Sequence, residues 1–181
     1  MIENKEIELK MLLTQEQFNQ LLQNYLPANF IKQTNYYFAA VNNAKNQSIR
    51  IRKKENKYLF TLKEKYEDYV QEYEKYTNDL SFENDHEIMD ILSKRNLVGP
   101  YTKIGELTTE RYMVIINNQA ELCFDINHYN GITDYEIEYE VIEPHDHKET
   151  FLNILASANI TYQPNPISKV KRCIDTKKEM E

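Results

Sequence analysis

The sequence predicts an α+β fold, mainly antiparallel, in which a sheet or barrel is flanked by helices. The 181 residues suffice for a single domain, 1–181, with a sizeable core. Short segments rich in Tyr, Phe, Ile and Thr follow one another in two groups, with tight-turn signals between them. Helical patterns stand before, between and after these groups. Runs of consecutive strands favour antiparallel pairing, and hence a sheet or barrel.

The chain opens with a predicted strand over residues 4–12 and a helix over 14–26. Thr14 and Gln17 have the spacing of a capping box, which marks a helix start. Apolar residues then recur at helical spacing, and they are Phe18, Leu21, Leu22, Tyr25 and Leu26. Pro27 ends the pattern.

About eight strands are expected in total. The first group after the helix covers residues 35–41, 48–54, 57–65 and 68–76. The second group covers residues 105–116, 120–127 and 133–142. Glu55–Asn56 and Asn117–Gln119 are the expected tight turns within them.

Three further helices are predicted. The pattern places one over 84–97, between the two groups of strands. The next begins at Asp146, with Glu149 three residues later. The last covers 168–178 and starts with a serine, the expected N-cap; the tail 176–181 is expected to fray.

Composition excludes several classes of protein. The formal net charge of -7 argues against broad, charge-driven binding to nucleic acid. The chain has neither a signal-peptide pattern at its start nor an apolar run suited to a membrane span. We therefore expect a cytoplasmic protein without a nucleic-acid or membrane partner, in which Cys123 and Cys173 are reduced core thiols. Dimerisation is left open by the sequence.

Charged residues occupy alternate positions along several predicted strands. In the opening stretch ENKEIELKM, Glu6, Glu8 and Lys10 alternate with aliphatic residues. Successive side chains of a strand point to opposite faces, so these charges share one face. A strand with one solvated face gives the same alternation, and a barrel with surface charge is the plain alternative.

The same alternation recurs with the charges sorted by sign. The residues that share a face on later strands are Arg50 and Arg52; Thr61, Lys63 and Lys65; Glu72 and Glu74; and Glu136, Glu138 and Glu140. Rows of like charge destabilise a plain surface. Arginine matches phosphate oxygens, whereas carboxylates suit Mg²⁺ or Mn²⁺. The pattern favours a metal–polyphosphate site on inward charged faces, with the aliphatic faces outward under helices.

An ordered set of motifs resembles the CYTH, or triphosphate tunnel metalloenzyme, family. The set consists of Glu6-Ile7-Glu8-Leu9-Lys10, Arg50-Ile51-Arg52, Thr61-Leu62-Lys63, Arg111, Asp125, the Glu-x-Glu strand 136–140 and Ser168-Lys169. One departure is that Tyr37-Phe38 is followed by Ala39-Ala40, where members often have Asp-Thr. It bears on a substrate contact or a loop, not on the charged core.

The resemblance implies a closed eight-stranded β-barrel tunnel with flanking helices. It implies that the phosphate binders are Lys10, Arg50, Arg52, Lys63, Arg111 and Lys169. It implies that Mg²⁺ or Mn²⁺ is held by Glu6, Glu8, Asp125, Glu136 and Glu138. Of all these residues, we expect the catalytic ones to be Glu6, Glu8, Lys10 and Arg52. Candidates of second rank are Glu72, Glu74, Lys65 and Glu140.

The activity that the resemblance implies is metal-dependent hydrolysis of a triphosphate. Inorganic triphosphate ranks first because it needs no pocket for an organic group. The alternatives in the same family are a class IV-type adenylyl cyclase, which needs a base pocket, and a thiamine triphosphatase, which needs an aromatic platform. A non-catalytic module that binds polyphosphate or nucleotides is a further alternative, although it would gain little from so many carboxylates.

Overall fold

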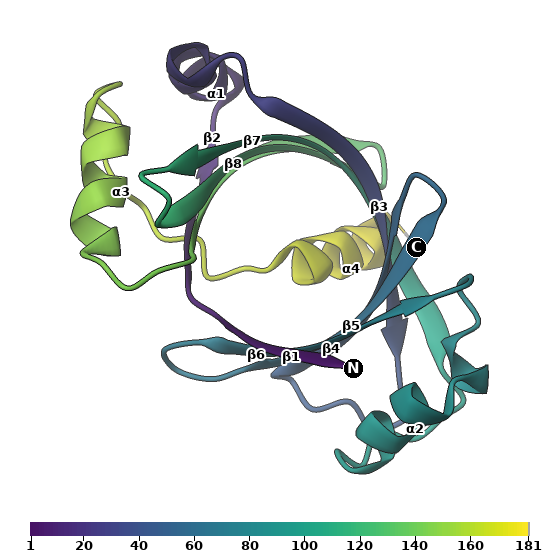
Figure 1. Cartoon of the computed structure of the whole chain (residues 1–181). Coiled ribbons are helices and arrows are strands. Elements are labelled where there is room, and N and C mark those ends of the chain that lie inside the picture. The colour runs from purple at the N-terminus through teal and green to yellow at the C-terminus, as the bar shows by residue number, and fades with distance from the viewer. Residues whose placement is uncertain (181) are drawn as a thin grey trace. The chain divides into compact units, whose positions relative to one another are not determined.

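The structure is a computed structural model that describes residues 1–180, and Figure 1 shows the whole chain. The described residues form nine strands, four α-helices and two short 3-10 helices. The strands are β1 (Ile2–Glu6), β2 (Glu8–Leu13), β3 (Asn29–Ala39), β4 (Gln47–Lys54), β5 (Lys57–Lys65), β6 (Val70–Thr77), β7 (Thr102–Ile116), β8 (Ala120–Tyr129) and β9 (Ile132–Val141). The helices are α1 (Gln15–Leu22), η1 (Gln23–Tyr25), η2 (Phe82–Asn84), α2 (His86–Ser93), α3 (His147–Ala156) and α4 (Lys169–Met180).

The chain forms two compact units, each built from separate stretches of sequence. Unit 1 contains Met1–Glu6, Gln33–Leu107 and the residues from Lys169 onward. Unit 2 contains Ile7–Lys32 and Thr108–Ser168. The long strands β3 and β7 each contribute residues to both units.

The sheet of unit 1 has the strand order β1-β6-β5-β4-β3, with antiparallel pairing. One face of this sheet is apolar and is covered by η2 and α2. Its buried core contains Ile49, Ile51, Phe60, Leu62, Phe82, Ile88 and Leu92. Burial of these large side chains removes apolar surface from water and is the main source of stability for this packing.

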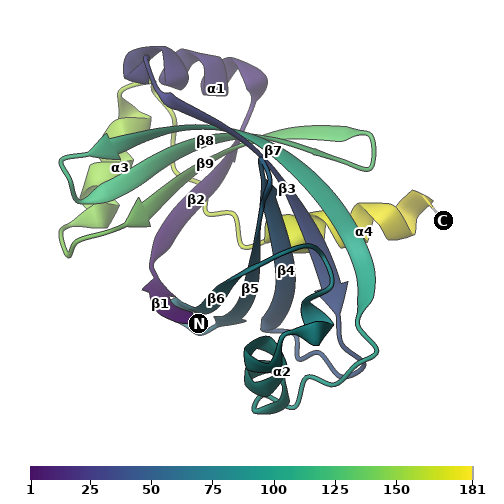
Figure 2. The same ribbon diagram turned by 45° about the vertical axis from the view of Figure 1, so that its right-hand side comes forward.

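The sheet of unit 2 has the strand order β7-β8-β9-β2, also with antiparallel pairing. Helices α1 and α3 pack on the same face of it (Figure 2). The core beneath them contains Met11, Leu13, Phe18, Leu21, Phe124, Ile137, Tyr139, Phe151 and Leu155. The rings of Phe18 and Phe124 meet edge to face, with their centroids 5.9 Å apart.

The predicted mainly antiparallel α+β fold is confirmed, but the prediction of eight strands is wrong. The expected strand 4–12 is two strands, because the chain changes its pairing partner at Ile7. Before this residue β1 pairs with β6, and after it β2 pairs with β9. The hydrogen-bonded strand order therefore begins with β1 and ends with β2, two strands that are consecutive in the chain.

The predicted starts of the first and third helices are confirmed, whereas the start of the second helix and several element ends differ. Thr14 and Gln17 form the capping box of α1, and the side chain of Asp146 accepts the N–H of Glu149 at the start of α3. The first helix, predicted to continue to residue 26, is α-helical only to Leu22 and is followed by the 3-10 helix η1. The second begins only at His86, because the Asp85 side chain accepts backbone N–H groups there.

Two strands and the last helix extend beyond their predicted ends. β3 starts at Asn29 and β7 at Thr102, before the predicted starts at residues 35 and 105. The last helix continues to Met180, where fraying was predicted from residue 176. Glu181, the end of that tail, lies outside the described residues.

The predicted turns are present. Asn117 and Asn118 both have positive φ, 52° and 57°, in the three-residue connection between the paired residues Ile116 and Ala120. Glu55 also has a positive φ of 54° in the β4–β5 turn.

Cys123 and Cys173 are buried free thiols, as expected. Within residues 1–180, none of the helices has the length and apolarity needed to cross a bilayer.

Candidate active site

In each unit the charged side chains lie on the sheet face opposite the apolar core. On β4, Arg50 is 8% exposed and alternates with Ile49 and Ile51, which belong to the helix-covered core. On β9, Glu136 is 0% exposed and alternates with Ile137 in the same way. The solvated-face interpretation is therefore wrong for these strands, because their charged residues are themselves buried.

Lys63 joins two carboxylates in unit 1. Its Nζ lies 2.8 Å from Glu6 Oε2 and also contacts Glu72 Oε1. The strand register explains this cluster, because β5 pairs Lys63 directly with Glu72. Burial alone would raise the pKa of Glu72, but Lys63 and Arg50 keep it below its usual value.

Arg50 is held by a buried hydroxyl. Its Nη2 donates to Thr61 Oγ1 at 3.0 Å, and the Thr61 hydroxyl donates to Glu74 Oε1 at 3.2 Å. The Arg50 Nε–H is buried and has no hydrogen-bond partner among residues 1–180. Such groups are rare in folded proteins, so this N–H is a donor suited to an anionic oxygen.

Two further predicted phosphate binders lie in unit 1. Arg52 donates from Nε to Asn35 Oδ1 at 3.0 Å. Burial raises the pKa of the Tyr37 hydroxyl, whereas the charges of Arg50, Lys169 and Arg52 act to lower it. The Tyr37 hydroxyl is therefore close enough to Arg50, Arg52 and Lys169 for the charge of each to affect its pKa. Lys65, a candidate of second rank, is instead exposed at the end of β5 and does not join this cluster.

Arg111 forms the tightest ion-pair cluster of unit 2. Its Nε and Nη2 donate to the two oxygens of Asp125 at 2.7 and 2.6 Å, and Nη2 also donates to Glu138 Oε2 at 2.5 Å. The β7–β8 register places Arg111 directly opposite Asp125. Burial would lower the pKa of Arg111, but these carboxylates raise it well above its usual value.

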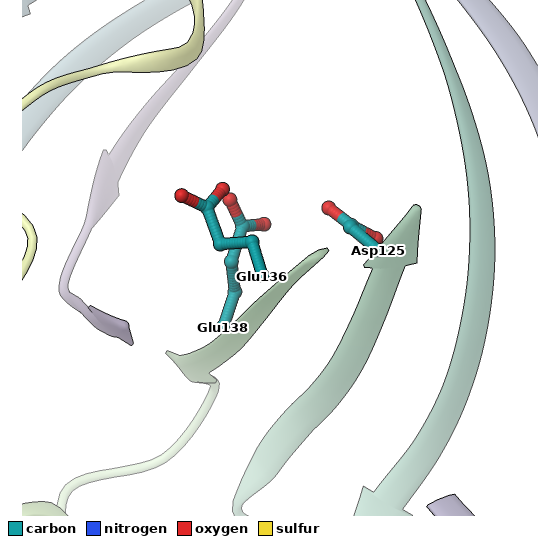
Figure 3. A group of neighbouring side chains, drawn as sticks. All are labelled: Asp125, Glu136 and Glu138. Carbon is teal, nitrogen blue, oxygen red and sulfur yellow. The ribbon is translucent and has the colours of Figure 1, made fainter. Parts of the chain in front are cut away.

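Asp125, Glu136 and Glu138 form an acidic triad in unit 2. Each is buried, and one carboxylate oxygen from each of the three lies within 4.8 Å of the other two. Figure 3 shows the three side chains projecting from β8 and β9 toward a common region. Three clustered oxygen donors fit a hard divalent cation such as Mg²⁺ or Mn²⁺. Arg111 donates hydrogen bonds to two of the three carboxylates, those of Asp125 and Glu138.

Lys10 and Glu8 stand beside the acidic triad in the β2–β9 register. Lys10 pairs with Glu138, and Glu8 pairs with Glu140, which is half-buried. The Lys10 Nζ lies 2.7 Å from Glu8 Oε1. Burial would lower the pKa of Lys10, but Glu8, Glu138 and Glu136 raise it above its usual value. A cation in this position offsets part of the charge of the triad.

Every predicted phosphate binder and metal ligand thus belongs to one of two sets. The set of unit 1 is Glu6, Arg50, Arg52, Lys63 and Lys169, joined by the second-rank Glu72 and Glu74. The set of unit 2 is Glu8, Lys10, Arg111, Asp125, Glu136 and Glu138, joined by Glu140.

Two polar residues near these sets, Asn165 and Asp134, were not among the predicted site residues. Asn165 donates from Nδ2 to Glu136 Oε2 at 3.1 Å. Asp134 accepts from Asn127 Nδ2 at 2.9 Å and from the Tyr129 hydroxyl at 2.6 Å. The parity of Asp134 with Glu136 in β9 could have marked it, because both positions share one face. Asn165 lies outside the strands, so strand parity could not have found it.

Comparison with known proteins places this geometry in a family. The model of the CYTH domain matches residues 4–174. A Bacillus subtilis protein named "Putative triphosphatase YjbK" is 27% identical over 188 residues, which cover 96% of each chain.

Solved structures of two further proteins are similar to this chain. A Bacillus halodurans protein described as a "putative adenylate cyclase" is 30% identical, with a TM-score of 0.82 over 95% of this chain and 98% of that chain. A Hippeastrum protein, "Putative adenylyl cyclase HpAC1", is described as having a dominant triphosphatase activity. It is 20% identical and shares the fold, with a TM-score of 0.76 over 97% of this chain and 96% of that chain. The chain belongs to the CYTH domain family.

Proposed function

We propose that this protein is a metal-dependent hydrolase of a triphosphate, with inorganic triphosphate as the first candidate substrate. The observation that carries the proposal is the buried acidic triad Asp125, Glu136 and Glu138, in which one carboxylate oxygen of each lies within 4.8 Å of the other two, beside Arg111. Buried carboxylates in such a group are costly without a cation. The predicted barrel tunnel is part of this proposal.

On the strength of the family motifs, the basic residues of each set would bind phosphate oxygens. Lys63, Arg111 and Lys10 each form ion pairs with carboxylates. These carboxylates would hold a divalent metal, and the basic side chains would then hold phosphate oxygens. The buried Arg50 Nε–H offers a further donor. The charge that spreads over phosphoryl oxygens during transfer is then stabilised by positioned cations.

The acidic triad would hold the metal, and Glu8 would act as a further ligand or orient metal-bound water. Glu6 is proposed for the same role on the strength of the family motif alone. A divalent ion bound there supplies a Lewis acid for a phosphoryl oxygen and a water of lowered pKa. The chain's own contribution is to fix the carboxylates: Asp125 and Glu138 face the same region from adjacent strands. We propose Glu6, Glu8, Lys10 and Arg52 as catalytic residues on the strength of the family motifs.

A second candidate function is a class IV-type adenylyl cyclase. It is favoured by the 30% identical Bacillus halodurans protein, which is described as a putative adenylate cyclase. Both reactions use a metal-bound triphosphate, and they differ in the nucleophile. Hydrolysis uses water and releases phosphate, whereas cyclisation uses a ribose hydroxyl and releases diphosphate.

The test is product release by the purified protein from inorganic triphosphate, ATP and thiamine triphosphate, with Mg²⁺, Mn²⁺ or EDTA. We expect phosphate from inorganic triphosphate with metal and none with EDTA. Glu136→Gln should abolish the release, whereas the control Lys94→Ala should not, because Lys94 forms an exposed pair with Asp90 on α2. Cyclic AMP and diphosphate from ATP would favour the cyclase. Tight binding without turnover would favour a non-catalytic binding module.

A further inference from the structure

The segment between α3 and α4 is fixed to β2 at a residue between two prolines. Asn165 stands between Pro164 and Pro166, and its backbone N–H donates to the Lys10 carbonyl at 3.1 Å. Two residues earlier, the Gln163 N–H contacts Met11 Sδ at 3.4 Å. Proline fixes its own φ and restricts the residue before it. The backbone at Asn165 is therefore held both by local stiffness and by β2.

The side chain of Asn165 has a defined orientation. Its Oδ1 accepts the backbone N–H of Ile167 at 3.1 Å. Since the carbonyl side of the amide is used in this turn, the NH₂ side points the other way. There Nδ2 donates to Glu136 Oε2 at 3.1 Å. The two groups are 29 residues apart in the chain.

We propose that Asn165 is a positioning residue for the metal site, which it serves by fixing the carboxylate of Glu136. Glu136 is 0% exposed, so solvent does not orient it. A hydrogen bond to one carboxylate oxygen restricts rotation of the group and leaves the other oxygen for the cation. Outer partners of this kind typically contribute 10–100-fold in metal affinity. The inference rests on the proposed function, because it assigns Glu136 to the metal.

Asparagine suits this role better than either of its close relatives. Aspartate could accept the Ile167 N–H in the same turn, but it would set a second carboxylate against Glu136. Alanine would lose both the turn and the donor. The two substitutions therefore separate the contribution of the turn from that of the hydrogen bond to Glu136.

The experiment measures Mn²⁺ binding to the metal-free protein by titration, with free Mn²⁺ followed by its electron spin resonance. We expect Asn165→Ala to weaken binding by roughly 10–100-fold. Gln163→Ala is the matched control: it lies in the same segment with an exposed side chain, and should bind as the wild type does. Asn165→Asp keeps the turn but replaces the donor to Glu136 by a second carboxylate, so its Mn²⁺ affinity at a fixed pH should also differ from that of the wild type.

The outcomes separate this inference from the proposed function. Wild-type Mn²⁺ affinity in Asn165→Ala or in Asn165→Asp overturns the role of Asn165. If Asn165→Ala does not fold, the Mn²⁺ affinity of Asn165→Asp still decides the question. A wild-type protein that binds Mn²⁺ but releases no phosphate from any triphosphate overturns the proposed function alone. A wild-type protein that binds no Mn²⁺ by itself but releases phosphate from a triphosphate in the presence of Mn²⁺ overturns the role of Asn165 alone.

Discussion

Replacement of Arg111 by methionine should lower the stability of the protein in the absence of metal and raise its affinity for a divalent metal. Arg111 donates three hydrogen bonds of 2.5–2.7 Å to Asp125 and Glu138, two members of the acidic triad. The guanidinium therefore binds carboxylate oxygens that a divalent ion would also use. Arg111→Met removes this internal competitor while retaining most of the apolar stem.

The structure sets the size of both effects. The Arg111 side chain is 11% exposed and that of Asp125 is 0% exposed, so solvent screens the pair little. Removal of one partner from a buried ion pair typically costs about 3–5 kcal/mol of stability. A hydrogen bond to a charged group contributes about 1.5–3 kcal/mol. Release of even one such bond should tighten Mn²⁺ binding by about tenfold or more.

The assay combines urea unfolding with Mn²⁺ titration in the absence of any phosphate. We expect Arg111→Met to be less stable without metal and to regain more stability than the wild type when Mn²⁺ is added, since a ligand that binds the folded state stabilises it. Its affinity for triphosphate should fall. Unchanged or weaker Mn²⁺ binding would refute the argument that Arg111 and the metal compete.

Arg95 provides a matched control for this prediction. Its Nε lies 2.9 Å from Glu64 Oε2, and its guanidinium rests 3.9 Å from the centre of the Tyr73 ring. The side chain is 18% exposed, close to the exposure of Arg111. Arg95→Met should also lower stability, but Mn²⁺ should stabilise it no more than it stabilises the wild type.

Two further predictions concern unit 1. Glu72→Gln should destabilise the protein at pH 7, because Lys63 holds the pKa of Glu72 below its usual value of 4.5 and the folded state therefore favours its charged form. This stabilisation is present above pH 4.5 and is lost as the pH falls through the lowered pKa, so urea unfolding should show the difference from wild type shrinking below pH 4.5; a constant difference would contradict it. Thr61→Val, at a site 0% exposed, should cost about 1–3 kcal/mol, since Arg50 loses its acceptor and Glu74 its donor. Steady-state kinetics should show a raised KM for triphosphate, and an unchanged KM would count against a phosphate role for Arg50.

Much of the site could be predicted from strand parity. Glu136 and Glu138 share one face of β9 while Ile137 and Tyr139 share the other, and the structure buries both faces. The period of two is a local property of the extended chain, so the sequence predicts it without knowledge of partners. The capping box of Thr14 and Gln17 is local in the same sense. The order of the charged motifs was enough to indicate the family.

The pairing of these faces was decided only by the tertiary structure. The break at Ile7, where one expected strand becomes two, follows from a change of partner between β6 and β9. The contact of Arg111 with Asp125 and Glu138 depends on the register of three strands. The contact of Asn165 with Glu136 depends on a loop whose backbone is hydrogen-bonded to β2. Register and loop placement depend on turns and on packing between distant segments, whereas alternation along one strand does not. The sequence by itself therefore determined which charges share a face, and tertiary pairing determined which carboxylate each cation neutralises.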